Sequence, residues 1–166
     1  GPGGLSAGYL LQQYGVDFEI LEASSHIGGR IRINTDFADF PIPLGAEWIE
    51  SDVSVLNEIV NDASIDVDIK TVTDEPDYKF VNSSWYGFFE TYLLPSVADK
   101  IRYNKVVTSI DYASDKVKVA TSDETFQADK VIVSVPLKVL QEGDIDFEPS
   151  LPQAKTTAIS EAVIWD

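Results

Sequence analysis

The chain has 166 residues, 44% of them hydrophobic, which is enough for one domain with a core of its own. Its 28 acidic residues outnumber the 12 basic ones, and the formal net charge is −16. Such a charge speaks against binding to nucleic acid, which requires Lys and Arg to neutralise phosphates, and against binding to anionic membranes. Because cysteine is absent, disulfides, thiolate chemistry and cysteine–metal sites are excluded.

The sequence also bears on where the protein works. It has no run of about 18 or more apolar residues, so no membrane span is expected. It has no signal-peptide pattern either, and a cytoplasmic location is therefore favoured. Methionine is absent even at position 1, which predicts a fragment, a processed product or the visible part of a longer protein. The oligomeric state is not indicated.

The first recognisable pattern is a glycine cluster followed by a helix. Residues 1–4 match the last four places of G-x-G-x-x-G, with Gly1 and Gly4 as its second and third glycines. Apolar spacing over residues 5–14 predicts a helix, and Gly15 is a typical stop. Glycines let the backbone approach a pyrophosphate, which the positive end of a helix attracts. The pattern predicts the grip of a dinucleotide-binding unit, whose first strand would precede residue 1.

A strand and a carboxylate follow at the spacing that such a unit requires. Apolar and polar residues alternate over residues 16–20, which predicts a strand. Glu22 comes at its end, 18 residues after Gly4, where a carboxylate can accept hydrogen bonds from ribose hydroxyls. The glycines alone could be a plain turn or a cloning remnant. The helix, the strand, Glu22 and the second glycine pair, Gly28-Gly29, favour nucleotide binding.

Three segments, in this order along the chain, carry a family resemblance. They are EASSHIGGR (residues 22–30), LGAEWIE (44–50) and ADKVIVSVPLKVLQEGDIDFEPSLP (128–152). Together they resemble the flavin-containing amine oxidases, which include monoamine oxidases, polyamine oxidases and flavin-dependent histone lysine demethylases. Phytoene desaturases and protoporphyrinogen oxidases are more distant relatives. Two positions depart from the family's pattern, His26 where Arg is common and Glu50 where His is common.

The resemblance implies an α/β fold, an FAD-binding, Rossmann-like doubly wound domain with a β-meander. Here that domain would lack its first strand and most of the substrate domain. Residues 1–166 would then be a partial FAD-binding domain. The family's substrate domain would insert near residues 64–83 and follow residue 166.

The resemblance also implies contacts with FAD. Arg30 would approach the phosphates, as charge-assisted hydrogen bonds favour. Residues 45–48 would lie near the flavin ring, although Trp48 is expected to pack rather than to catalyse. Val107 would contact the adenine through its backbone, and Val135 would pass close to the cofactor. The predicted cofactor-binding residues are Gly1, Gly3, Gly4, Glu22, Ala23, Gly28, Gly29, Arg30, Gly45, Ala46, Glu47, Trp48, Val107 and Val135.

The middle of the chain is predicted to be mainly helical. Apolar spacing predicts a core-facing helix over residues 52–63, and residues 65–70 alternate as a short strand does. Residues 83–101 predict a second helix that Pro95 should break or kink. Its aromatic stripe could line a substrate channel, but such a stripe is far more often core.

The last third of the chain is predicted to be mainly β. Residues 106–110 are rich in β-branched residues, residues 116–121 alternate, and residues 125–128 can pair back after a turn at 122–123, which predicts strands. The continuous apolar run over residues 131–135 predicts a strand buried on both faces.

The function implied is oxidation of a small-molecule amine by hydride transfer to FAD, giving an imine that hydrolyses, with a polyamine-type substrate slightly favoured. No catalytic residue is assigned, no metal site is expected, and His26 inside the cofactor motif is a poor candidate for a base. One alternative is a non-catalytic FAD- or nucleotide-binding module or fragment, and another is a relative of the flavin desaturases or protoporphyrinogen oxidases. A third interpretation, an NAD-dependent dehydrogenase, is supported by the first glycine fingerprint alone. Residues 28–30 and 128–152 speak against it.

Overall fold

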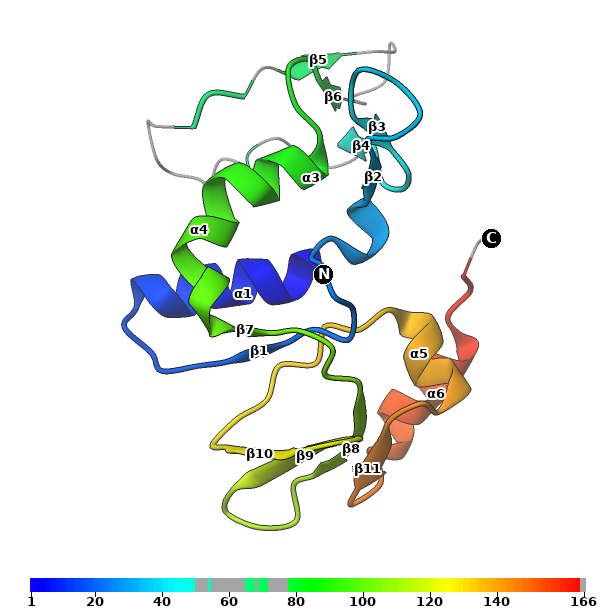
Figure 1. Cartoon of the computed structure of the whole chain (residues 1–166). Helices are drawn as coiled ribbons and strands as arrows, with labels where there is room; N and C mark the ends of the chain where they lie inside the picture. Colours follow the sequence, from blue (N-terminus) through cyan, green and yellow to red (C-terminus); the bar gives the residue numbers. More distant parts are fainter. Residues whose placement is uncertain (50–53, 55–64, 68, 72–77, 165–166) are drawn as a thin grey trace. The chain divides into compact units, whose positions relative to one another are not determined.

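A computed structural model of the chain describes residues 1–49, 54, 65–67, 69–71 and 78–164. The chain divides into two compact units (Figure 1). The first unit comprises Gly1–Ile20 and Ile27–Ile101, and the second comprises Leu21–His26 and Arg102–Asp166.

Helix α1 (Pro2–Gln13) confirms the helix predicted over residues 5–14 and begins three residues earlier. Its buried face includes Leu5 and Gly8. A Cβ added at Gly8 would come within 2.6 Å of Ile20 Cδ1, so the glycine lets the helix pack closely on this segment. Gly15, at φ +65°, follows the end of the helix, as a stop residue does.

The strand predicted over residues 16–20 was wrong in extent. Strand β1 is only Ile20–Leu21, and it forms a two-stranded sheet with β7 (Ile101–Arg102). Alternation predicts which face of a strand is apolar, but a strand forms only where a neighbour offers its backbone groups. Because β7 is only two residues long, it offers no backbone partners to a strand longer than β1.

The second helical segment runs through four short elements without a break at Pro95. It comprises α3 (Trp85–Phe88), the π-helical turn η2 (Phe89–Leu93), α4 (Leu94–Val97) and the 3₁₀ turn η3 (Ala98–Lys100). Pro95 lies in the first turn of α4, where amides have no intrahelical acceptor, so the missing N–H of proline breaks no hydrogen bond of that helix. The change to a π-helical turn just before it therefore replaces the predicted break or kink.

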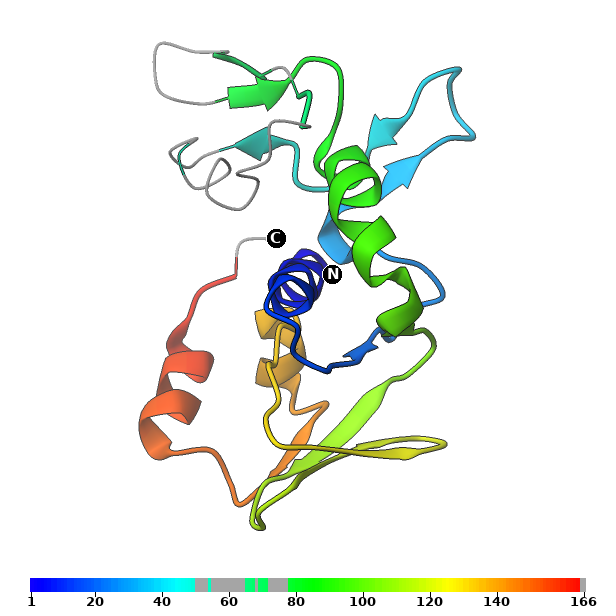
Figure 2. The ribbon, with the colours of Figure 1, turned by 90° about the vertical axis from the view of Figure 1, so that its left-hand side faces the viewer.

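The aromatic stripe of this segment is core, as predicted. Phe88, Phe89 and Leu93 are all buried, and Phe88 is only 1% exposed. The rings of Phe88 and Phe89 lie edge to face, with centroids 5.6 Å apart. Helix α4 packs against α1, and the two lie side by side in Figures 1 and 2. The stripe thus joins the two helical parts of the first unit.

Two small sheets complete the first unit. Strands β2 (Ile33–Asn34) and β3 (Ile42–Pro43) pair antiparallel. The other sheet has the order β4-β6-β5. Its strands are Trp48–Ile49, Tyr78–Phe80 and Ile69–Thr71. Strand β5 confirms only the end of the strand predicted over 65–70, and the helix predicted over 52–63 lies almost wholly outside the described residues.

The second unit is built on the predicted meander. Its sheet has the order β10-β9-β8-β11, where β8 is Val107–Asp111, β9 is Val117–Thr121 and β10 is Thr125–Ala128. These three strands pair antiparallel, and β11 (Asp146–Glu148), which the sequence did not predict, pairs parallel with β8. Ile110, Val119 and Ile145 form the buried core.

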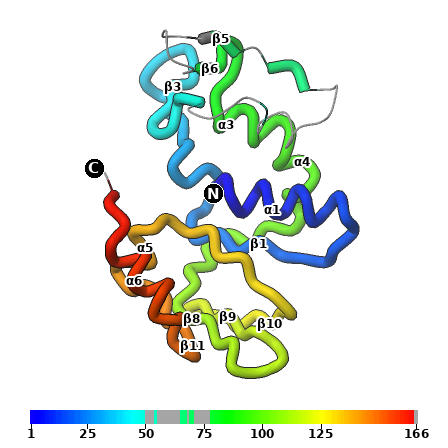
Figure 3. Tube along the Cα trace, turned by 180° about the vertical axis from the view of Figure 1, so that it is seen from behind, coloured from blue at the N-terminus to red at the C-terminus, as the bar shows by residue number. Residues whose placement is uncertain are grey.

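Two further helices follow the meander. Helices α5 (Leu137–Glu142) and α6 (Gln153–Glu161) lie side by side, as Figure 3 shows. The Gln141 side-chain amide joins them by donating to the carbonyl oxygens of Ile159 and Ala162, at 2.8 Å each.

The buried strand predicted over residues 131–135 was wrong. These residues form no strand, and Ile132 is 65% exposed. A continuous apolar run becomes a strand only between two strands that pair with it. No described strand pairs with this run, so its backbone stays outside the sheet.

Candidate functional site

The N-terminus of α1 is suited to an anion. Gly1 is the N-cap residue and contributes no side-chain cap, and Pro2 occupies the first turn. The first intrahelical bond runs from the Leu5 amide to the Gly1 carbonyl oxygen, at 3.2 Å. Helix geometry leaves the amides of Gly3 and Gly4 without an intrahelical acceptor, and they carry the positive end of the helix dipole.

The second glycine pair lies beside this helix end. A Cβ added at Gly29 would lie 3.5 Å from Gly1 Cα, which brings the two glycine clusters together within the first unit. Gly28 and Gly29 have φ values of +115° and +53°, conformations that side chains disfavour. Arg30 follows in the 3₁₀ turn Gly29–Ile31, with an exposed side chain. The structure therefore brings the two glycine clusters together, and Arg30 follows the second cluster directly in the chain.

The segment of residues 45–48 is anchored to Arg30 by its backbone. The Ala46 amide donates to the Arg30 carbonyl oxygen at 3.0 Å. A Cβ at position 45 would lie 1.8 Å from the same oxygen, so only glycine allows this approach. Such contact with Arg30 was not predicted, because residues 30 and 45 are joined by no local pattern.

The side chains of Glu47 and Trp48 are held by a lysine on β6. Lys79 Nζ lies 2.9 Å from Glu47 Oε1 and 3.8 Å from the centroid of the Trp48 ring. Trp85 Nε1 donates to the Trp48 carbonyl oxygen at 3.0 Å. Trp48 is 39% exposed, so its packing role stays a prediction. Sequence reasoning missed Lys79, because no local pattern pairs residue 79 with residue 48.

In the second unit, the segment that carries Glu22 is clamped to residues 102–105. The Glu22 amide donates to the Arg102 carbonyl oxygen at 2.9 Å, and the Lys105 amide donates to the Glu22 carbonyl oxygen at 3.0 Å. The Asn104 amide donates to the Ser24 carbonyl oxygen, also at 3.0 Å. The backbone that carries the predicted ribose carboxylate and Ala23 is thus fixed on both sides of Ala23.

The Glu22 carboxylate itself is oriented by Ser24. Oε1 accepts from the Ser24 amide at 3.0 Å and from the Ser24 hydroxyl at 2.7 Å. Partial burial raises the pKa of the Glu22 carboxyl, but hydrogen bonds, among them those from Ser24, lower it by more, so the pKa lies below its ordinary value of 4.5. Partial burial and the charge of Glu22 also raise the pKa of the Tyr103 hydroxyl. Glu22 is therefore ionised at neutral pH, and both of its oxygens are acceptors.

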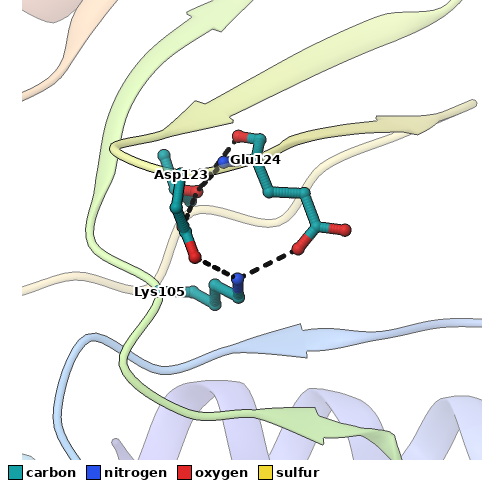
Figure 4. A network of polar contacts seen from close by, with 4 residues as sticks. Lys105, Asp123 and Glu124 are labelled. Carbon is teal, nitrogen blue, oxygen red and sulfur yellow. Dashed lines mark hydrogen bonds and ion pairs between the residues drawn. The ribbon is translucent and has the colours of Figure 1, made fainter.

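Lys105 ties this segment to the turn between β9 and β10. Its ammonium lies between the carboxylates of Asp123 and Glu124, at 2.7 and 3.0 Å (Figure 4). The hydrogen bond between Lys105 and Asp123 raises the pKa of the lysine and lowers that of the aspartate. The Lys105 amide is thus bonded to Glu22, and the Lys105 side chain is bonded to the turn between β9 and β10.

The two valines predicted near the cofactor differ in their surroundings. Val107 lies at the start of β8, half-buried, and packs against the core of the second unit. Val135 is 36% exposed in the run that forms no strand. A backbone contact at Val107 is compatible with its packing, since it leaves the side chain in the core.

The comparisons with known proteins identify the family. The sequence model described as "Flavin containing amine oxidoreductase" matches residues 2–88 and 89–162. The chain belongs to this family. Among solved structures, putrescine oxidase bound to putrescine has a TM-score of 0.76, at 13% identity over 96% of this chain and 61% of that one. The α/β flavin-binding fold expected from the sequence is thereby confirmed.

Curated members of the amine oxidoreductase family match over a shorter stretch. Polyamine oxidase 6 of Oryza sativa subsp. japonica is 48% identical over 66 residues, which are 39% of this chain and 13% of that protein. Lysine-specific histone demethylase 2 of Homo sapiens is 46% identical over 61 residues, which are 36% of this chain and 7% of that protein. The match therefore spans a small part of these curated relatives. No helix in the described part of the chain is both long and apolar enough to cross a membrane.

The cofactor of this family is FAD, and the described residues fit parts of it. In the first unit, the uncapped end of α1 and the close glycines suit a pyrophosphate. In the second unit, an ionised carboxylate fixed by two hydrogen bonds suits a ribose diol.

Proposed function

We propose that this protein oxidises an amine with FAD, and that its substrate is a polyamine. The observation that carries the proposal is the oriented Glu22 carboxylate, because a fixed acceptor of this kind suits the ribose of the adenosine half of FAD. Bound FAD would supply the redox chemistry by accepting a hydride, and the chain's own residues would bind and orient it.

We assign the cofactor roles by unit. In the first unit, the glycines and Arg30 would hold the pyrophosphate, and residues 45–48 would lie along the flavin ring. In the second unit, Glu22 and Ala23 would hold the ribose, Val107 would contact the adenine through its backbone, and Val135 would pass near the cofactor. We further propose that residues 1–166 belong to one FAD-binding domain, and we assign no catalytic residue.

Three observations support a polyamine as the substrate. A relative from rice is named polyamine oxidase, and one structural neighbour is a putrescine oxidase. The net charge of −16 also favours encounter with a polycation, because a field of one sign raises the local concentration of the opposite charge. Histone demethylase relatives leave a lysine side chain as the competing substrate.

The test is anaerobic mixing of the FAD-loaded protein with putrescine, spermidine or a peptide that carries dimethyl-lysine. Loss of the flavin absorbance band with a polyamine, but not with the peptide, is the expected result. Bleaching by the peptide alone would contradict the polyamine assignment. A flavin that no amine reduces would instead favour the alternative, a nucleotide-binding module without turnover.

A further inference from the structure

Ser24 donates two hydrogen bonds to the Glu22 carboxylate. Both its amide and its hydroxyl donate to one oxygen, Oε1, at 3.0 and 2.7 Å. A glutamate side chain has several rotatable bonds, and two donors on one oxygen restrict all of them.

Ser24 is itself fixed by residues that are far away in the sequence. Its carbonyl oxygen accepts from the Asn104 amide at 3.0 Å. Asn104 has a φ of +57°, a conformation that asparagine tolerates better than most side chains. The bonds of Glu22 to Arg102 and Lys105 hold the other end of the same segment. The donor is therefore held as firmly as the acceptor that it orients, which is what preorganisation of a binding group requires.

We propose that Ser24 is a positioning residue for ribose recognition, which rests on the proposed FAD-binding function. Its hydroxyl holds Glu22 Oε1 so that the carboxylate meets the ribose diol without first having to be ordered. The role belongs to the hydroxyl, because the amide donates whatever the side chain. Ser24→Ala should therefore loosen the carboxylate, and Ser24→Thr should retain the bond.

The test compares ligands that contain or lack the ribose hydroxyls. Dissociation constants for FAD, ADP and 2′,3′-dideoxy-ADP are measured for the wild type, Ser24→Ala, Ser24→Thr and Ser25→Ala. Ser25 is an exposed neighbour and serves as the control. Ser24→Ala should weaken FAD and ADP roughly three- to tenfold, the effect of losing one hydrogen bond. The dideoxy ligand should be unaffected, Ser24→Thr should restore binding, and Ser25→Ala should change nothing.

The outcomes separate this proposal from the proposed function. If the wild type binds neither FAD nor ADP, the FAD-binding function fails, and the role of Ser24 fails with it. If the wild type binds both and Ser24→Ala binds them equally well, only the role of Ser24 is overturned. Equal weakening of ADP and the dideoxy ligand would also overturn it, because a general structural effect does not distinguish the hydroxyls. Melting temperatures are measured for all variants to identify a folding defect. If Ser24→Ala is defective in folding, the binding of FAD and ADP by Ser24→Thr decides whether the hydroxyl has the proposed role.

Discussion

A methyl group at residue 45 would lie 1.8 Å from the carbonyl oxygen of Arg30. The obstacle is backbone, which cannot rotate away as a side chain does, and the neighbouring Ala46 amide is bonded to the same oxygen. Residues 30 and 45 are therefore locked at a distance that only glycine permits. This contact joins the glycine-pair turn to residues 45–48, which we propose lie near the flavin ring.

Gly45→Ala should destabilise the protein by about 3 kcal/mol or more, because the backbone has to separate to admit the methyl group. Gly15→Ala is the control, since its Cβ meets nothing within 4 Å and its only penalty is a φ of +65°. That penalty is about 1–2 kcal/mol. Urea unfolding measures both variants. A Gly45→Ala variant no less stable than Gly15→Ala would contradict the close approach.

Phe88→Ala should lower the free energy of unfolding by about 3–5 kcal/mol, because the ring is 1% exposed and packs among other aromatic rings. Phe37→Ala is the matched control. Its ring is 85% exposed, so the loss should stay within about 0.5 kcal/mol. Similar losses for the two variants would refute the core assignment of the aromatic stripe.

Lys105→Ala should speed hydrogen exchange of the Asn104 amide, because the variant frees the segment from Asp123 and Glu124. The effect should stay below about fivefold and shrink with added salt, since these carboxylates are exposed. Lys116→Ala, which removes an exposed ion pair with Asp129, is the control. Exchange at Asn104 that is equally fast in both variants would show that Lys105 does not hold this segment.

The lowered pKa of Glu22 predicts a pH dependence of stability. A carboxyl whose pKa is lowered by folding stabilises the protein above its unfolded value, and the contribution is lost as the pH falls through the folded value. The wild type should therefore be more stable than Glu22→Gln at neutral pH, with a constant difference down to its ordinary value of 4.5. The difference should shrink as the pH falls below 4.5 and through the lower pKa of the folded state. A stability difference between the wild type and Glu22→Gln that already narrows well above pH 4.5 would contradict a lowered pKa of Glu22.

Local periodicity predicted those elements that form from their own residues and nearest neighbours. Helix α1 and the strands of the meander follow from spacing and turn residues alone. The burial of Phe88, Phe89 and Leu93 also followed from the helical spacing of apolar residues. The three family segments predicted the family, which the match of the family model then confirmed.

Elements that depend on distant partners were not predictable in this way. The run over residues 131–135 has the composition of a buried strand, but no described strand pairs with it. Strand β11 was missed because its pairing with β8 joins segments 37 residues apart. Ser24 stood two residues after the expected carboxylate, a spacing typical of side-chain bonds to nearby groups. Its anchoring by Asn104 becomes visible only in three dimensions.

The most direct test of the account measures FAD binding by the purified chain. Visible absorbance during gel filtration shows whether FAD is retained, and titration gives the affinity. We expect a flavin band that stays with the protein. Glu22→Ala should weaken binding by roughly 1.5–3 kcal/mol, the scale of hydrogen bonds to a charged group. Asp17→Ala, which removes an exposed carboxylate before β1, should leave the affinity unchanged. Failure of the chain to retain FAD, or equal affinity in the wild type and Glu22→Ala, would contradict the claim that these residues form a nucleotide-binding site.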